Sequence, residues 1–161
     1  MSGGELYLGH QLQGVDDKGR VAIPSDFRSA FEANAAVREI FIARDRALGC
    51  LIASDLAWYK DNFERVDARH QAALDQGLEV DARQKPAMFG NPERAQFDAN
   101  GRFILPGFSR SKARIDRWAF FHGGGRTFHI WAPEVLLASA HADEEARELC
   151  EYAMQQRKAR A

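Results

Sequence analysis

Cysteine is scarce in this sequence of 161 residues, with Cys50 and Cys150 as its two examples. They form no C-x-x-C motif, so neither a disulfide framework nor a cysteine-based redox or metal motif is expected. Cys50 stands near a segment with a strand pattern, and Cys150 stands within a helical pattern. We therefore predict that both are buried thiols that contribute to packing.

Long apolar runs are absent as well. The sequence has no run of about 18 apolar residues, so no membrane-spanning helix is expected. Its first ten residues, MSGGELYLGH, contain no basic stretch followed by an apolar stretch, which excludes an ordinary secretory signal. These absences favour a cytoplasmic protein with no membrane partner.

Charge of one sign is not in excess, because the formal net charge is −1. The overall composition therefore gives no indication of a nucleic-acid partner, and the local distribution of charge has to be examined instead. Hydrophobic residues make up 45% of the chain and charged residues 28%, which is typical of a globular protein and not of a disordered one.

Motifs for catalysis, metals and phosphates are missing too. The G-G-G-R-T segment from Gly123 lacks the Gly-Lys-Ser/Thr end of a phosphate-binding loop and is interpreted as a hairpin turn. The histidines form no H-E-x-x-H motif and no Cys/His cluster, so no metal site is predicted. We expect no catalytic residue, cofactor or small-molecule substrate. The five histidines are His10, His70, His122, His129 and His141.

The sequence contains an internal repeat. The segment GVDDKGRVAIPSDFR, from Gly14, matches QFDANGRFILPGFSR, from Gln96, at a constant offset. Further on, IFIARDRALGCLIASDL from Ile40 resembles AFFHGGGRTFHIWAPEV from Ala119. Solenoids and propellers repeat a unit many times, whereas two spaced copies indicate duplication of one small β-rich unit.

Each repeat is predicted to contain two hairpins around a short helix. In the first repeat, strands at 7–15 and 20–23 flank a D-D-K-G turn, and Ser25 and Asp26 cap a helix that runs to about Phe31. The segments I-F-I-A and C-L-I-A form the second hairpin. Such a unit has exposed strand edges that must pair with another copy, so we expect the copies to intertwine, either within one chain or between chains.

Helical patterns flank the second repeat. Apolar residues recur at helical spacing from Ser54 to about Asp75, which predicts an amphipathic helix with Ser54 as its N-cap, packed on the β-structure. A last helix is predicted to begin at Asp143. The domain boundaries follow: a first domain at 7–54, a helical linker at 55–92, a second domain at 93–138 and a C-terminal helix at 139–161.

The motif that carries chemistry is Asp-x-x-x-Arg with Gly before the Arg. It occurs as D-D-K-G-R at 16–20 and as D-A-N-G-R at 98–102. The Asp can accept hydrogen bonds from turn N–H groups, so the motif can simply shape a turn. A turn fixed in this way also presents its Arg in a defined direction, and the two roles can coexist.

This combination resembles the SpoVT-AbrB family of swapped-hairpin DNA-binding domains, and more closely the MraZ family, which carries two such domains in tandem. The resemblance covers most of the chain, through YLG, DDKGRVAIPSDFR, DANGRFILPGFSR and FHIWAPEVL. It implies an α+β, β-rich fold, namely a tandem swapped-hairpin AbrB-like barrel formed by two ββαββ repeats with flanking helices.

The resemblance also implies a function. MraZ-like proteins are transcriptional regulators that bind direct repeats in the promoter of the division and cell-wall gene cluster as closed homo-oligomeric rings. We therefore expect a nucleoid-associated regulator, with repression as the expected outcome. By position, the DNA-binding candidates are Lys18, Arg20, Arg28, Arg102 and Arg110. The turn-organising residues are Asp16, Gly19, Asp98 and Gly101.

The residue types suit this role, because Arg can form two parallel hydrogen bonds with guanine, whereas Lys mainly attracts phosphate. Arg20 is the strongest candidate. From 98 to 114 the second repeat has four basic residues and one acidic residue, whereas 16–28 has three of each. The charge balance therefore favours the second repeat as the DNA-contacting face, whereas the resemblance favours the first. We retain the first repeat, because the direction of the side chains matters more than the summed charge.

Two alternatives remain in view. Aspartic proteases also combine two Asp-bearing halves, but they need Gly two residues after the Asp, whereas Gly19 and Gly101 follow after three and precede an Arg that would keep the carboxylate ionised. An enzyme is therefore not expected. The other alternative is a DNA-independent oligomeric scaffold or an antitoxin-like protein-binding module of the same fold.

Overall fold

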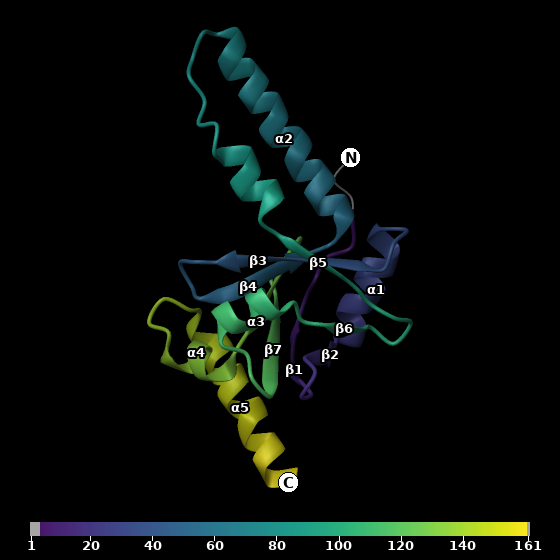
Figure 1. Ribbon diagram of the computed structural model, residues 1–161. Helices are drawn as coiled ribbons and strands as arrows, with labels where there is room; N and C mark the ends of the chain where they lie inside the picture. Colours follow the sequence, from purple (N-terminus) through teal and green to yellow (C-terminus); the bar gives the residue numbers. More distant parts are fainter. Residues whose placement is uncertain (1–3, 161) are drawn as a thin grey trace.

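The computed structural model describes residues 4–160 and has an α+β fold (Figure 1). Among the described residues, no helix is both long enough and apolar enough to cross a membrane. In chain order the elements are β1 (His10–Gly14), β2 (Arg20–Ala22), α1 (Ser25–Asn34), β3 (Glu39–Asp45), β4 (Cys50–Ser54), α2 (Leu56–Asp75), a π-helical turn η1 (Pro86–Gly90), β5 (Glu93–Gln96), β6 (Arg102–Ile104), α3 (Gly107–Ala113), β7 (Trp118–Gly123), β8 (Phe128–Trp131), α4 (Pro133–Ala138) and α5 (Glu144–Arg160).

Six of the strands form one antiparallel sheet in the order β1-β7-β8-β4-β3-β5, and β2 and β6 form a second, two-stranded sheet. The β-rich α+β class predicted from the sequence is therefore confirmed. The closed barrel is not present in residues 4–160, because β1 and β5 remain the two edges of an open sheet. After each of these edge strands the chain turns away, and β2 and β6 pair with each other instead of closing the sheet.

Most of the strand pairs are formed between the two repeats. β1 pairs with β7, β4 with β8, β3 with β5, and β2 with β6, so each of these pairs joins one repeat to the other. Of the two outcomes expected from exposed edges, pairing within one chain or between chains, the structure shows the first. The hairpins β3–β4 and β7–β8 form within their own repeats, as predicted.

The predicted hairpins of β1 with β2 and of β5 with β6 are wrong. Tight turns do follow β1 and β5, but the flanking main-chain groups are bonded to the other repeat. Val15 N–H donates to Arg117 O at 2.8 Å, and Ile23 N–H donates to Gly101 O at 2.8 Å. A main-chain donor forms one strong bond, so these groups are no longer available to pair across their own turn.

The core lies on both faces of the larger sheet. Neighbouring residues of a strand point to opposite faces, so Phe121 and Phe120 enter different apolar clusters. The cluster of Phe121 includes residues of α1 and of the two-stranded sheet, and the cluster of Phe120 includes residues of α4 and α5. Cys50 and Cys150 are both buried in the latter and form no disulfide, which confirms the prediction of buried thiols.

A buried carboxylate begins α2. Its N-cap is Asp55 and not Ser54 as predicted, because Asp55 Oδ1 accepts the N–H of Trp58 at 2.9 Å. Asp55 Oδ2 accepts hydrogen bonds from Tyr7 Oη at 2.5 Å and from Asn34 Nδ2 at 3.0 Å. A buried carboxylate is tolerated when its oxygens are bonded in this way. Burial and the neighbouring Asp55 raise the pKa of Tyr7, so its hydroxyl keeps its proton.

The prediction that α2 packs on the β-structure holds only at the start of the helix, where Tyr59 packs on Phe41 of β3 with a ring separation of 5.0 Å. In Figure 1, α2 projects away from the sheets, and the segment at 78–92 returns alongside it. Val66 is the buried residue of the helix, while Phe63 is 40% exposed. Phe63 packs on Phe89 of the returning segment with a ring separation of 5.2 Å, so the apolar face of the helix is covered by its own return. We call this projection, residues 56–92, the arm.

The N-terminal ends of α1 and α5 also differ from the predictions. The predicted caps of α1, Ser25 and Asp26, are wrong: Pro24 holds the N-cap position, and no side chain bonds there. The start of α5 lies one residue beyond its prediction, and Asp143 acts as its cap by accepting the N–H of Ala146 at 2.9 Å.

Removal of a central aromatic ring should test this core. Phe128 is 1% exposed and packs against Tyr7 and Phe27 at ring separations of 5.0 and 4.8 Å. We expect Phe128→Ala to reduce the free energy of unfolding by about 3–5 kcal/mol, measured by urea denaturation. Tyr152 is 63% exposed, so Tyr152→Ala is the control and should change stability by at most about 0.5 kcal/mol. A cost below about 1 kcal/mol for Phe128→Ala would contradict this account of the core.

Candidate functional site

The first turn, residues 16–20, is organised by a carboxylate. Asp16 Oδ1 accepts the main-chain N–H groups of Lys18 at 3.0 Å and of Arg20 at 2.8 Å. The N–H of Gly19 donates to Asp16 O at 2.9 Å, and Gly19 has φ +83°. A residue with a Cβ would be strained at this φ, which explains the glycine.

The second turn, residues 98–102, repeats this geometry. Asp98 Oδ1 accepts the N–H groups of Asn100 at 2.9 Å and of Arg102 at 3.0 Å. Gly101 N–H donates to Asp98 O at 2.9 Å, and Gly101 has φ +79°. Asp98 and Gly101 therefore hold the same positions in the second turn as Asp16 and Gly19 hold in the first.

The same carboxylates orient the two arginines. Asp16 Oδ2 lies 2.6 Å from Arg20 Nε, and Asp98 Oδ2 lies 3.2 Å from Arg102 Nε. The arginine side chains are 56% and 62% exposed. Exposed ion pairs add at most about 1 kcal/mol to stability, so their main effect is on direction. Within residues 4–160, the Nη groups of both arginines make no hydrogen bond, so they can bind acceptors on a partner.

Hydrogen bonds also set the charge of the two carboxylates. The main-chain N–H of Arg20, followed by its side chain, lowers the pKa of Asp16 below the ordinary value of 3.8. The main-chain N–H of Arg102 is the largest cause of the lowered pKa of Asp98. Both groups are therefore ionised at neutral pH and remain acceptors for the turn.

The structure brings the two turns together through main-chain bonds. Gly19 O accepts the N–H of Leu105 at 2.9 Å, and Gly101 O accepts the N–H of Ile23 at 2.8 Å. The strands that follow the turns pair in the register Val21 opposite Phe103. An open cleft between them is lined by both motifs, including Asp16, Arg20, Asp98 and Arg102.

The remaining predicted residues differ in their surroundings. Lys18 is exposed at the tip of the first turn. Arg28 and Arg110 are partly buried, and each lies against the turn of the other repeat: a Cβ at Gly101 would be 3.3 Å from Arg28 Cδ, and one at Gly19 would be 3.2 Å from Arg110 Nη1. The sequence motif could not show this exchange, because it depends on the pairing between repeats.

Arg110 has much of its hydrogen-bonding capacity engaged inside the chain. Its Nε donates to Ile115 O at 3.0 Å, and its Nη2 donates to Asp116 O at 2.8 Å. These bonds hold the segment after α3. Ile104, which was not predicted, is 58% exposed and lines the cleft. Arg102 and Ile104 are two residues apart on one strand, so their side chains lie on the same face of it. This spacing is the sequence signal that could have identified Ile104.

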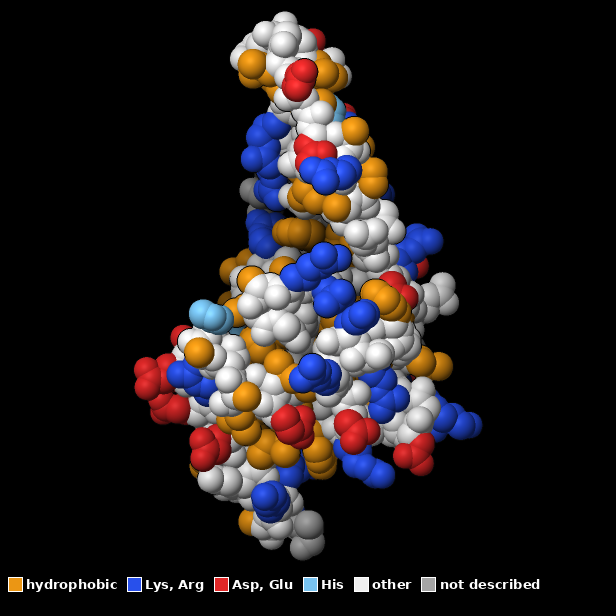
Figure 2. All heavy atoms as spheres, turned by 60° about the vertical axis from the view of Figure 1, so that its left-hand side comes forward, with side chains coloured by type: hydrophobic (Ala, Val, Ile, Leu, Met, Phe, Trp, Pro, Cys, Tyr) orange, Lys and Arg blue, Asp and Glu red, His pale blue; other side chains and the backbone are white. Residues whose placement is uncertain are grey.

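Basic side chains are unevenly distributed even though the net charge is −1. On the face in Figure 2, Lys and Arg gather on the arm and across the middle of the molecule, and Asp and Glu are more frequent toward the C-terminal helix. The overall charge therefore does not describe the local field that an approaching partner meets.

No family model matches the chain. Curated relatives do match: a protein of Rhodospirillum rubrum named "Transcriptional regulator MraZ" is 32% identical over 134 residues, which is 83% of each chain. A protein of the same name from Ruegeria sp. is 33% identical over 152 residues, 88% of this chain and 86% of the relative. The chain belongs to the MraZ family. A Pseudomonas putida member of the MraZ family is 27% identical over 86% of the chain.

Acid should open both turns of this MraZ family member. Because the pKa values of Asp16 and Asp98 are lowered in the folded chain, their bonds add stability above pH 3.8, and this contribution is lost as the pH falls through the lower folded values. Carboxyl ¹³C NMR titration should therefore give midpoints below 3.8 for both. Midpoints at or above the ordinary value would show that the carboxylates do not accept these bonds.

A methyl group at the second turn should disturb the contact between repeats. Gly101→Ala places a Cβ 3.2 Å from Ile23 O at φ +79°. The backbone strain alone costs about 1–2 kcal/mol. Gly77 has φ +75° with no atom within 4 Å of its would-be Cβ, so Gly77→Ala is the matched control for strain. In urea denaturation, Gly101→Ala should cost more than Gly77→Ala; equal costs would contradict close packing of the turns.

Proposed function

We propose that this chain is a transcriptional regulator that binds double-stranded DNA through the face formed by its two Asp-x-x-x-Arg turns. The supporting observation is the pair of exposed arginines, Arg20 and Arg102, each oriented by an ionised Asp and placed around one cleft. The curated relatives are named transcriptional regulators, which agrees with this role.

Arg20 is proposed to read base edges, with Arg102 as its counterpart in the second repeat. Its Nε is occupied by Asp16, which leaves the two Nη groups to donate to guanine O6 and N7. Lys18, at the exposed tip, is suited to phosphate contact. Arg28 and Arg110 are proposed to support the turns and to add positive charge beside them, because each lies against the turn of the other repeat.

The fold is proposed to be a tandem swapped-hairpin arrangement of two AbrB-like domains. The proposed domains are residues 7–54 and 93–138, separated by a helical linker at 55–92 and followed by a C-terminal segment at 139–161 that contains α5; residue 161 lies outside the described residues. The reciprocal pairing of β2 with β6 supports this proposal, since each strand follows the turn of its own repeat and pairs with the other.

We further propose that the protein acts as a homo-oligomeric ring on direct repeats in the promoter of the division and cell-wall gene cluster, and that it represses transcription there. One pair of arginines gives limited affinity. Several copies of the same face joined in one assembly would raise the local concentration of binding sites, with gains of about 100- to 10,000-fold in avidity.

Catalysis is not part of this proposal. The two carboxylates of the cleft are each bonded to an Arg and have lowered pKa values, so they are poorly suited to share or donate a proton. The remaining alternative is a DNA-independent oligomeric scaffold or an antitoxin-like module of the same fold, which would not need two outward arginines.

The decisive experiment measures binding to the DNA upstream of the protein's own gene. Arg20→Ala should weaken specific binding by about 1–3 kcal/mol, or roughly 5- to 150-fold, in fluorescence anisotropy. Arg83→Ala is the matched control, because Arg83 is also paired with an Asp and is 90% exposed, but lies in the arm. Urea denaturation should show that both variants retain stability within about 0.5 kcal/mol of the parent chain.

Specific binding that survives Arg20→Ala would refute the assignment of Arg20. Log affinity should also fall linearly with log salt, with a slope of about −0.9 for each phosphate neutralised. If the parent chain shows no specific binding, the scaffold alternative is favoured. Sedimentation analysis of the same samples tests the ring separately, and a monomer at working concentrations would refute it.

A further inference from the structure

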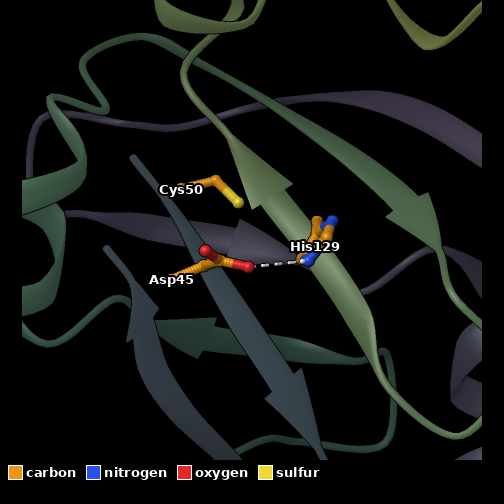
Figure 3. A group of neighbouring side chains, drawn as sticks. All are labelled: Asp45, Cys50 and His129. Carbon is orange, nitrogen blue, oxygen red and sulfur yellow. Dashed lines mark ion pairs between the residues drawn. The ribbon is translucent and has the colours of Figure 1, made fainter. Parts of the chain in front are cut away.

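Three possible metal ligands converge at one end of the β3–β4 hairpin. Asp45 ends β3, Cys50 begins β4, and His129 lies on the neighbouring strand β8. Asp45 and Cys50 are direct cross-strand partners. Figure 3 shows the three side chains pointing toward one another, and one ligand atom from each lies within 4.8 Å of the others.

The distances between the ligand atoms of Asp45, Cys50 and His129 suit one shared cation better than a direct hydrogen bond between Asp45 and His129. His129 Nε2 lies 3.5 Å from Asp45 Oδ2, which is long for a hydrogen bond between these groups. Two nitrogen or oxygen ligands on a tetrahedral zinc ion, each 2.0–2.1 Å from the metal, are separated by about 3.3 Å. A sulfur ligand is separated from them by about 3.6 Å, so the distances from the sulfur of Cys50, which are at most 4.8 Å, would need to shorten by about 1.2 Å at most.

The hairpin turn holds the carboxylate in place. Asp45 Oδ1 accepts the N–H of Leu48 at 3.1 Å, and Asp45 O accepts the N–H of Gly49 at 2.7 Å. These bonds leave Oδ2 directed at His129. Hydrogen bonds that orient a ligand before the metal arrives are a regular part of protein metal sites.

The protonation states are compatible with binding. Burial lowers the pKa of His129 below its ordinary 6.5 despite the nearby Asp45, so the imidazole is neutral at pH 7 and has a lone pair for a metal. Burial raises the pKa of Cys50, so without a metal the thiol keeps its proton. A metal that coordinates the sulfur must displace this proton.

We propose that Asp45, Cys50 and His129 form a binding site for one Zn²⁺ ion. Mixed sulfur, nitrogen and oxygen ligands favour Zn²⁺ over Mg²⁺ or Ca²⁺, which prefer oxygen alone. Cys50 is 2% exposed, whereas the side chains of Asp45 and His129 are 24% and 26% exposed, so the fourth position faces solvent and is taken by water. Binding forms the Zn–S bond and releases the thiol proton to solvent.

This site is separate from the candidate DNA-binding face. In Figure 1 the β3–β4 turn and the β2–β6 pair lie on opposite sides of the molecule. The site also borders the apolar cluster that contains Cys50, Trp131 and Cys150, so bound Zn²⁺ would link the hairpin to β8 beside the packing of α4 and α5.

The test uses the full chain and Co²⁺ as a spectroscopic substitute for Zn²⁺. Titration should saturate at one equivalent and give a thiolate-to-cobalt charge-transfer band, which Zn²⁺ then removes by displacement. Cys50→Ser should abolish the band, and Asp45→Asn and His129→Gln should weaken Co²⁺ binding at least tenfold. Asp45→Asn retains the oxygen that accepts the N–H of Leu48, so this variant should keep the turn.

Cys150→Ser is the matched control, because Cys150 is also a buried thiol of the same cluster but is outside the ligand group. It should bind one Co²⁺ with the charge-transfer band unchanged. Three outcomes would overturn the proposal: no saturable binding to the parent chain, a band that persists in Cys50→Ser, or equal loss in Cys150→Ser. Circular dichroism confirms that each variant is folded; if Cys50→Ser is not, Asp45→Asn and His129→Gln decide.

Discussion

Each Asp-x-x-x-Arg turn is held by the turn-forming strand of the other repeat. Gly19 O accepts the N–H of Leu105, and Gly101 O accepts the N–H of Ile23, so each turn is joined to the residue that follows the short strand of the other repeat. The strands β2 and β6, with three residues each, are too short to be stable by themselves. Their pairing depends on these crossed bonds and on the apolar residues beneath them, and the position of both arginines depends on that pairing.

The carboxylates connect this scaffold to the chemistry of the surface. One oxygen of Asp16 binds the main-chain N–H groups of its turn, and the other binds the side chain of Arg20, so a single residue fixes both the loop and the direction of the cation. Asp98 has the same two contacts in the second repeat. An arginine oriented before a partner arrives loses less conformational entropy on binding than a freely rotating one.

From the sequence, the local geometry of the turns could be predicted better than the choice of which strands pair. The turn of Asp16 and Gly19 depends on a few adjacent residues, and its dihedral and hydrogen-bond requirements are visible there. The choice of β6 as the partner of β2 is made across the chain, and alternation of apolar residues does not specify it. The pattern of α2 likewise indicated an apolar face but not that Phe89 would cover it. The Asp45, Cys50 and His129 group was invisible for the same reason, since its members meet only through strand order.

The pairing between repeats also affects synthesis on the ribosome. β1 is made early, yet its partner β7 begins at Trp118, and β3 must wait for β5. Contacts between distant segments slow folding, and unpaired strands are prone to aggregate in the interval. The nascent first repeat therefore exposes open strand edges until most of the chain has emerged from the ribosome.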